Sequence, residues 1–122
     1  MKRKEDTISI NNLKNTNNHG KQKNQPIKMK EDIVTREKID KYRKISEKAL
    51  SLAKKNISKG KEQEAKEIIE MVECYLSDSK HFEKQGNLVN AFAAINYAHG
   101  WLDSGARLRI FNVTDRKLFT IC

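Results

Sequence analysis

Four polar side chains near the C-terminus fall on one face of a predicted helix. They are Asn96, His99, Asp103 and Arg107, and their spacing of three or four residues aligns them along that helix. A histidine, a carboxylate that could orient it and a cation for phosphate are the parts of a general acid–base site. The spacing also has a structural explanation, because Asp103 and Arg107 are placed as an ordinary intrahelical ion pair. Asn96 and His99 could equally hydrogen-bond the ends of neighbouring helices. We favour the structural explanation and assign no catalytic residue.

Two aromatic residues lie on the same predicted helix. Tyr97 and Trp101 are four residues apart, which suits either a stacking platform for nucleic-acid bases or an aromatic pair in a core. Their alanine-rich surroundings favour the core. With the four polar residues, they make up a candidate binding face of Asn96, Tyr97, His99, Trp101, Asp103 and Arg107.

Neither a metal site nor a cofactor site is expected. Cys74, Asp78, His81 and His99 match no standard set of metal ligands in their spacing, and only Asp78 and His81 share a helical turn. The sequence also lacks a glycine-rich phosphate loop, a nucleophile elbow and an HExxH motif.

Three helices are expected to position these residues, at about 35–58, 61–85 and 87–109. Gly60 and Gly86 supply left-handed residues that end the first two helices, and Asn87 caps the third. Such short connections make consecutive helices antiparallel neighbours. The apolar stripe of the first helix is Ile39, Tyr42, Ile45, Ala49, Leu52 and Asn56, and that of the second is Ala65, Ile68, Ile69, Val72, Tyr75, Leu76, Ser79 and Phe82.

The third helix is apolar or small over most of its length, so we expect it to be buried on most sides. Ala91, Ala94, Ala98 and Gly105 would let a neighbouring backbone approach closely. The predicted fold class is therefore all-α: a three-helix bundle in which an antiparallel helical hairpin receives a third, buried helix. A short C-terminal segment carries Phe111, Val113, Leu118, Phe119 and Ile121, and we expect it to fold back onto the bundle because it would otherwise expose an apolar surface.

The chain divides into a basic arm, residues 1–30, and a helical domain, residues 31–122. The arm holds eight Lys/Arg against two Asp/Glu, so it contributes +6 of the formal net charge of +9. Its apolar residues show no sustained period, which predicts disorder. A cationic arm can bind nucleic acid through salt-sensitive contacts. The excess of lysine and asparagine is equally well explained by compositional bias.

We expect a cytoplasmic protein. No apolar core of seven or more residues follows the basic start, and no run approaches the roughly 18 apolar residues of a membrane span. Cys74 and Cys122 form no paired motif, which argues against a disulfide framework.

The run NAFAAINYAHGWLDSGARL, preceded by YLSDSKHFEKQG and followed by RIFNVTDRKLFTI, resembles an archaeal family catalogued as domain of unknown function 357. The resemblance covers about residues 41–121, and INYAHGWLD is its specific string. It implies an all-helical fold and an association with a nucleotidyltransferase-like domain, to which the family is joined in some archaea. No catalytic role carries over. The basic arm is extra to the family, and Arg109 stands where the family tends to have glycine. The signature run includes Ala93, Asn96, Tyr97, Gly100, Asp103 and Gly105.

Two functions follow as alternatives. The first is a non-enzymatic interaction or scaffold module whose partner is another protein or a second copy of the chain. The second is an accessory protein that binds RNA or other nucleic acid through the basic arm and Tyr97 and Trp101. An enzyme using His99, Asp103 and Arg107 is a third, less favoured hypothesis.

Overall fold

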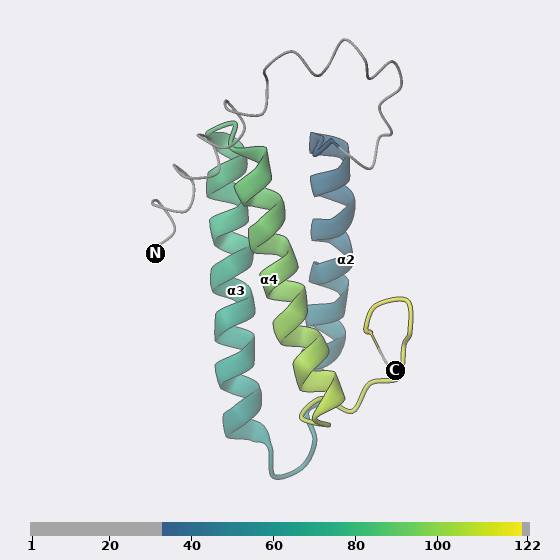
Figure 1. Cartoon of the computed structure of the whole chain (residues 1–122). Helices are drawn as coiled ribbons and strands as arrows, with labels where there is room; N and C mark the ends of the chain where they lie inside the picture. Colours follow the sequence, from purple (N-terminus) through teal and green to yellow (C-terminus); the bar gives the residue numbers. More distant parts are fainter. Residues whose placement is uncertain (1–32, 121–122) are drawn as a thin grey trace. The chain divides into compact units, whose positions relative to one another are not determined.

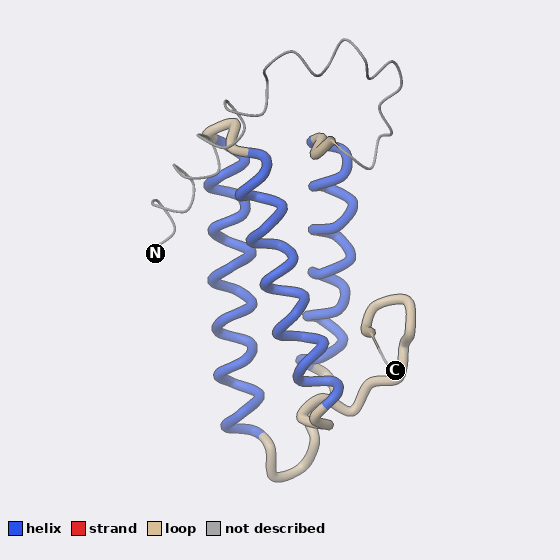
Figure 2. The backbone as a smooth tube through the Cα atoms, viewed as in Figure 1, coloured by secondary structure: helices blue, strands red, loops and turns tan. Residues whose placement is uncertain are grey.

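The computed structural model describes residues 33–120, and three α-helices account for most of them. They are α2 (Arg36–Lys54), α3 (Glu62–Lys84) and α4 (Leu88–Arg107). The described part of the chain contains helices, turns and one isolated β-bridge but no extended strand (Figure 2). The predicted all-α class is therefore confirmed. The predicted disordered arm, residues 1–30, and the last two residues, Ile121 and Cys122, lie outside the described residues.

Helix α4 packs against both of the other helices, whereas α2 and α3 touch each other less (Figure 1). Successive helices run in opposite directions, so α4 lies antiparallel to α3 and parallel to α2. The turn between α3 and α4 is tight because Gly86 adopts a φ of 77°, which glycine accepts without steric cost.

The core lies where α4 meets α2 and α3. Three alanines of α4, Ala91, Ala94 and Ala98, are buried and bring its backbone close to its neighbours. Larger side chains fill the remaining space. They include Ile39 and Leu50 from α2, Ile68, Val72 and Leu76 from α3, and Ile95 and Leu102 from α4.

Helix α2 ends at Lys54, earlier than the sequence pattern predicts, and Gly60 does not end it. The chain instead pairs Ile57 with Phe111 in an antiparallel bridge. The backbone N–H of Ser58 donates to the carbonyl of Ile110 at 2.9 Å, and that of Asn112 donates to the carbonyl of Asn56 at 2.7 Å. These bonds replace the next helical turn, and Gly60 turns the chain toward α3 afterwards.

The buried stripe of α2 also differs from the predicted one. Arg43 and Ser46 are buried, whereas Tyr42 is 38% exposed. Polar side chains can occupy a helix interface when they find partners there, and both do, as described below. At the start of α2, the hydroxyl of Thr35 accepts a hydrogen bond from the backbone N–H of Lys38 at 3.1 Å. Asn87 holds the corresponding position of α4, but its side chain makes no capping hydrogen bond.

The segment after α4 folds back onto the bundle, as predicted. Phe111 and Phe119 are almost fully buried. The turn that starts this segment is a Schellman motif, in which the backbone N–H of Ile110 donates to the carbonyl of Gly105 at 2.9 Å and that of Arg109 to the carbonyl of Ala106 at 3.1 Å. Arg109 has a φ of 62°, the conformation that glycine favours. The turn therefore has the shape that a glycine would adopt, although arginine occupies it.

None of the three helices is both long enough and apolar enough to cross a membrane.

Candidate functional site

The six residues of the predicted binding face do not form one site. Asn96, Tyr97 and Trp101 lie on the outer face of α4. His99 and Asp103 contact α2 and the C-terminal segment. Arg107 lines a hollow at the end of α4. The predicted face is thus divided into three regions: an apolar groove, a hydrogen-bonded cluster and a cationic hollow.

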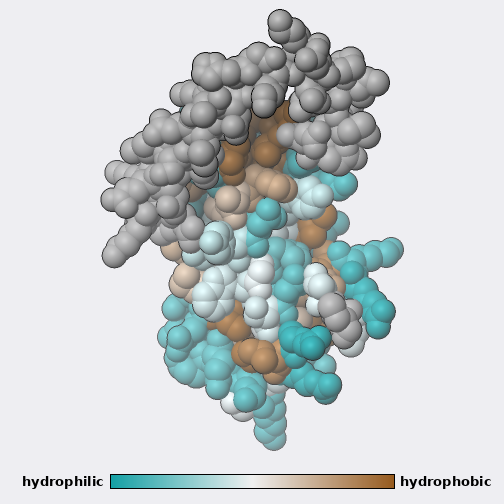
Figure 3. All heavy atoms as spheres, viewed as in Figure 1, coloured by the Kyte–Doolittle hydropathy of each residue, from teal (hydrophilic) through white to brown (hydrophobic). Residues whose placement is uncertain are grey.

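The outer face of α4 carries a shallow groove of about 610 Å³, which we call the α4 groove. Tyr97 is 51% exposed and Trp101 is 38% exposed, so their predicted burial in the core is wrong. Two helices cover the alanine-rich side of α4 and leave the opposite side open, so the expectation that α4 is buried on most sides is also wrong. The middle of this side, over α4, is intermediate in hydropathy, and its borders are mostly hydrophilic (Figure 3). The groove is lined by Ala93, Asn96, Tyr97, Gly100, Trp101 and Ser104.

The aromatic ring of Tyr97 packs against a buried ring of α3. Its ring stacks on that of Tyr75 from α3, with centroids 5.3 Å apart and planes inclined by 14°. Tyr75 is itself buried, so one face of the Tyr97 ring is covered. Gly100 provides the open part of the groove, because a Cβ added there would meet no atom within 4 Å. The groove is therefore a preformed, mainly apolar surface on a rigid helix.

His99 joins three parts of the fold. Its Nδ1 lies 3.0 Å from the hydroxyl of Ser46 on α2, and its Nε2 lies 3.7 Å from Oδ1 of Asp103. That carboxylate oxygen also accepts a hydrogen bond from the backbone N–H of Thr120 at 2.8 Å. The order serine, histidine, aspartate resembles a nucleophilic triad, but Ser46 is only 1% exposed. Its hydroxyl cannot reach a substrate, so the geometry supports a structural role that fastens α2 and the C-terminal segment to α4.

Three arginines line a hollow of about 700 Å³ beyond the end of α4, which we call the arginine hollow. Arg107 comes from the last turn of α4, Arg109 from the Schellman turn and Arg116 from the C-terminal segment. The predicted site included Arg107 but neither Arg109 nor Arg116. The spacing of these three arginines in the sequence does not predict that they line one hollow. The remaining lining residues are Ser58, Ala106, Phe111, Asn112, Val113, Thr114 and Thr120.

A buried ion pair between α2 and α3 was missed by the sequence analysis. The guanidinium of Arg43 donates to Glu83 Oε1 at 2.7 Å and to the Ser79 hydroxyl at 3.1 and 3.3 Å. The two charged side chains are only 10% and 18% exposed. A signal was present, because Arg43 and Ser46 continue the spacing of Ile39 on α2. We assign this cluster to stability rather than to a site.

Across residues 33–120, no three His, Cys, Asp or Glu side chains gather closely enough to hold a metal ion.

The comparisons with curated proteins and with solved structures returned no match. The scan of family models matched residues 41–111, which is more than half of the chain and contains α3, α4 and most of α2. On that match, the chain belongs to the family described as protein of unknown function, DUF357.

Proposed function

We propose that the protein is a helical interaction module and that the α4 groove binds an amphipathic helix of a partner protein. The exposure of Tyr97 and Trp101 beside the open space at Gly100 carries this proposal. Aromatic side chains bury a large area at little entropic cost and are enriched where partners bind most tightly. Their exposure on an ordered helix therefore favours a binding role.

The shape of the groove favours a helix as its occupant. Ala93, Tyr97, Gly100 and Ser104 follow one another at intervals of four, three and four residues, the spacing of a seam between packed helices. Small residues at three of these positions allow a close approach. A helix that presents apolar anchors at similar intervals would fit this surface.

A partner protein fits the groove better than a second copy of the chain. Six of the described residues line it, whereas stable protein interfaces use about 20–30 residues a side. Two grooves facing each other would thus supply too little surface for a stable dimer. A partner that also contacts the neighbouring helices would bury more. A nucleotidyltransferase-like protein in the cytoplasm is the partner we propose to look for first.

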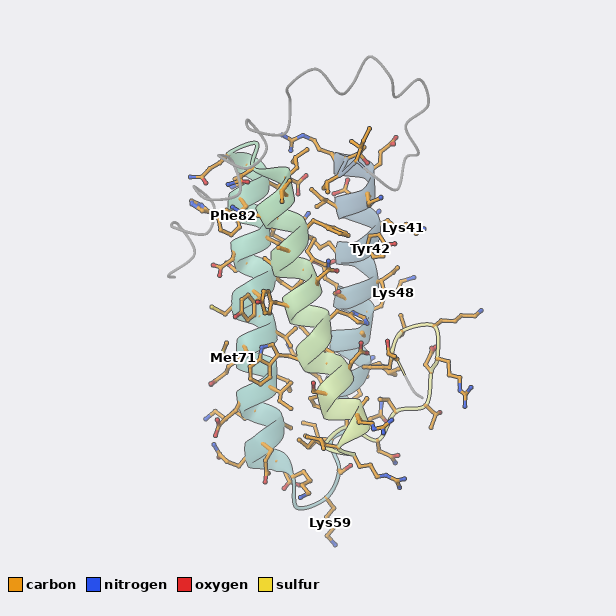
Figure 4. The ribbon with its side chains drawn as sticks, in the orientation of Figure 1. Lys41, Tyr42, Lys48, Lys59, Met71 and Phe82 are labelled. Carbon is orange, nitrogen blue, oxygen red and sulfur yellow. The ribbon has the colours of Figure 1, made fainter. Side chains whose placement is uncertain are left out.

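Site-specific photo-crosslinking in the native host tests this proposal. A benzoylphenylalanine in place of Tyr97 or Trp101 should capture the same partner. The same residue in place of Lys48, which projects from α2 away from α3 and α4, should not (Figure 4). Equal capture from Lys48 and from the groove, or no capture from the groove, would refute the proposal.

A groove-blocking variant makes the test stricter. Because a Cβ at Gly100 has open space around it, Gly100→Phe should fold normally while its ring fills the groove. Crosslinking through Trp101 should then disappear although the unfolding temperature is unchanged or higher. Persistent crosslinking in Gly100→Phe would place the partner elsewhere.

Nucleic-acid binding is the second candidate function, because Tyr97 and Trp101 are exposed as a stacking platform requires. Titration of a single-stranded RNA at rising salt separates the two functions. Binding that persists above about 0.2 M salt and weakens in Trp101→Ala would support base stacking, because contacts to phosphate alone decline steeply with salt. Binding that is lost with salt and unaffected by Trp101→Ala would reduce this candidate to the charge of the basic arm.

A further inference from the structure

The arginine hollow is a second concave surface, separate from the α4 groove. It is more enclosed than the groove, and polar groups dominate its lining. Of the ten lining residues within the described range 33–120, three are arginines and none is acidic, while Ser58, Asn112, Thr114 and Thr120 contribute hydroxyl and amide groups. Such a set of donors recognises an anion.

Like charges gather around this hollow. Arg107, Arg109 and Arg116 are exposed, so solvent and salt weaken the repulsion between their guanidinium groups without abolishing it. Among residues 33–120, the ion pairs involve neither Arg109 nor Arg116. The nearby carboxylate of Asp115 accepts a hydrogen bond from the backbone N–H of Lys117 at 2.8 Å. A bound anion would relieve the repulsion.

The backbone of Arg109 gives an independent indication. Its φ of 62° lies in the left-handed region, which costs a residue with a Cβ about 1 kcal/mol relative to glycine. Glycine would form the same turn more easily. The chain nevertheless places a guanidinium at this position, beside the hollow. Residues held in an unfavourable backbone conformation are found most often at functional sites.

We propose that the arginine hollow binds a small ligand that carries two or more linked phosphates. Guanidinium groups pair with phosphate oxygens through two parallel hydrogen bonds, and three of them match the charge of an oligophosphate better than that of a single carboxylate. A volume of about 700 Å³ is within the range of small-molecule sites. The exposed aromatic side chains that would stack nucleic-acid bases line the α4 groove instead, which favours a small ligand over an RNA strand.

Calorimetric titration of the full chain with inorganic tripolyphosphate tests the proposal. Binding should saturate at one ligand per chain and persist when sodium chloride is raised to match the ionic strength of the ligand. Arg116→Ala and Arg109→Gly should each weaken binding about tenfold, as expected for the loss of one charge-assisted contact. Lys41→Gln, which removes a charge from the upper half of α2, should leave binding unchanged (Figure 4).

Arg109→Gly distinguishes the loss of a contact to the ligand from a loss of folding stability. Because glycine suits a φ of 62°, this variant should unfold at a higher temperature than the natural chain and yet bind tripolyphosphate more weakly. Two competitors identify the source of the phosphates. If a nucleoside triphosphate displaces tripolyphosphate, the natural ligand is a small molecule. If an oligonucleotide binds far more tightly than tripolyphosphate and the nucleoside triphosphate do, the proposal of a small ligand is wrong.

Two further results would overturn the proposal: no saturable binding of tripolyphosphate, or binding that Lys41→Gln weakens as much as Arg109→Gly does. The proposal stands independently of the α4 groove. Trp101→Ala and Gly100→Phe should leave the binding of tripolyphosphate unchanged, and Arg116→Ala should leave crosslinking through Tyr97 unchanged.

Discussion

Alanine in place of Gly105 should destabilise the domain, whereas the same change at Gly100 should stabilise it. Both glycines lie within α4, so each substitution gains up to about 1 kcal/mol in helix propensity. Their surroundings differ. A Cβ on Gly105 would overlap the ring of Phe111, with Cδ2 at 2.6 Å, and would press on Cδ1 of Ile68 at 3.2 Å. A Cβ on Gly100 would meet nothing within 4 Å.

The overlap at Gly105 is difficult to relieve. Phe111 is 1% exposed, and its backbone is tied to Ile57 by the β-bridge. Its backbone N–H also donates to the carbonyl of Gly105 at 3.2 Å. Overpacking of a well-filled core costs about 1–3 kcal/mol, which exceeds the gain in helix propensity. We therefore expect Gly105→Ala to lower the free energy of unfolding by about 1–2 kcal/mol and Gly100→Ala to raise it by up to about 1 kcal/mol.

Urea unfolding followed by circular dichroism, together with thermal melts, measures this difference. A change of 1 kcal/mol shifts the melting temperature of a domain this small by about 4–8 °C, so a difference of about 1–3 kcal/mol should separate the melting temperatures of the two variants by about 4–24 °C. If Gly105→Ala were as stable as the natural chain, Phe111 would not be packed on α4. The C-terminal segment would then not be fastened to α4 by Phe111.

Three further changes test other contacts. Glu83→Ala should lower the free energy of unfolding by about 2–4 kcal/mol, because it removes the carboxylate that accepts a hydrogen bond from the buried guanidinium of Arg43 and leaves only the more distant carboxylate of Asp40, at 3.6 Å; a loss below about 0.5 kcal/mol in urea unfolding would show that water already reaches this pair. Asp103→Ala should remove the acceptor for the backbone N–H of Thr120 and cost about 1 kcal/mol. Faster amide hydrogen exchange at Thr120 would report the loss, and an unchanged rate would contradict the contact. Phe119→Ala should cost about 3–4 kcal/mol, because the ring is 2% exposed, and near-neutral unfolding would show that the segment does not dock.

Helices α3 and α4 could be predicted closely from the sequence because their signals are local. Gly86 marks the turn between them, and the apolar spacing of α3 from Ala65 to Ser79 coincides with its buried face. The end of α2 could not be predicted in this way. It depends on the pairing of Ile57 with Phe111, two residues that are far apart in the sequence.

The candidate site was harder to predict, because hydrophobic character does not say which surface covers a residue. Tyr97 and Trp101 have the apolar pattern of a core, yet they lie on the side of α4 that neither α2 nor α3 covers. Arg43 has the pattern of an exposed residue, yet it is buried beside Glu83. Arg109 and Arg116 line one hollow, which depends on how the chain folds back after the Schellman turn.

Acrylamide quenching of tryptophan fluorescence tests most directly the central claim, which is that the α4 groove, left open by residues 33–120, is available to a partner. Trp101 is the single tryptophan of the chain, so the signal reports this surface alone. In the purified 122-residue chain, we expect quenching close to that of an exposed indole and unchanged as the protein concentration rises. A strongly shielded Trp101 at low concentration would show that the chain covers its own groove. Shielding that grows with concentration would show that a second copy covers it, and either result would contradict the account.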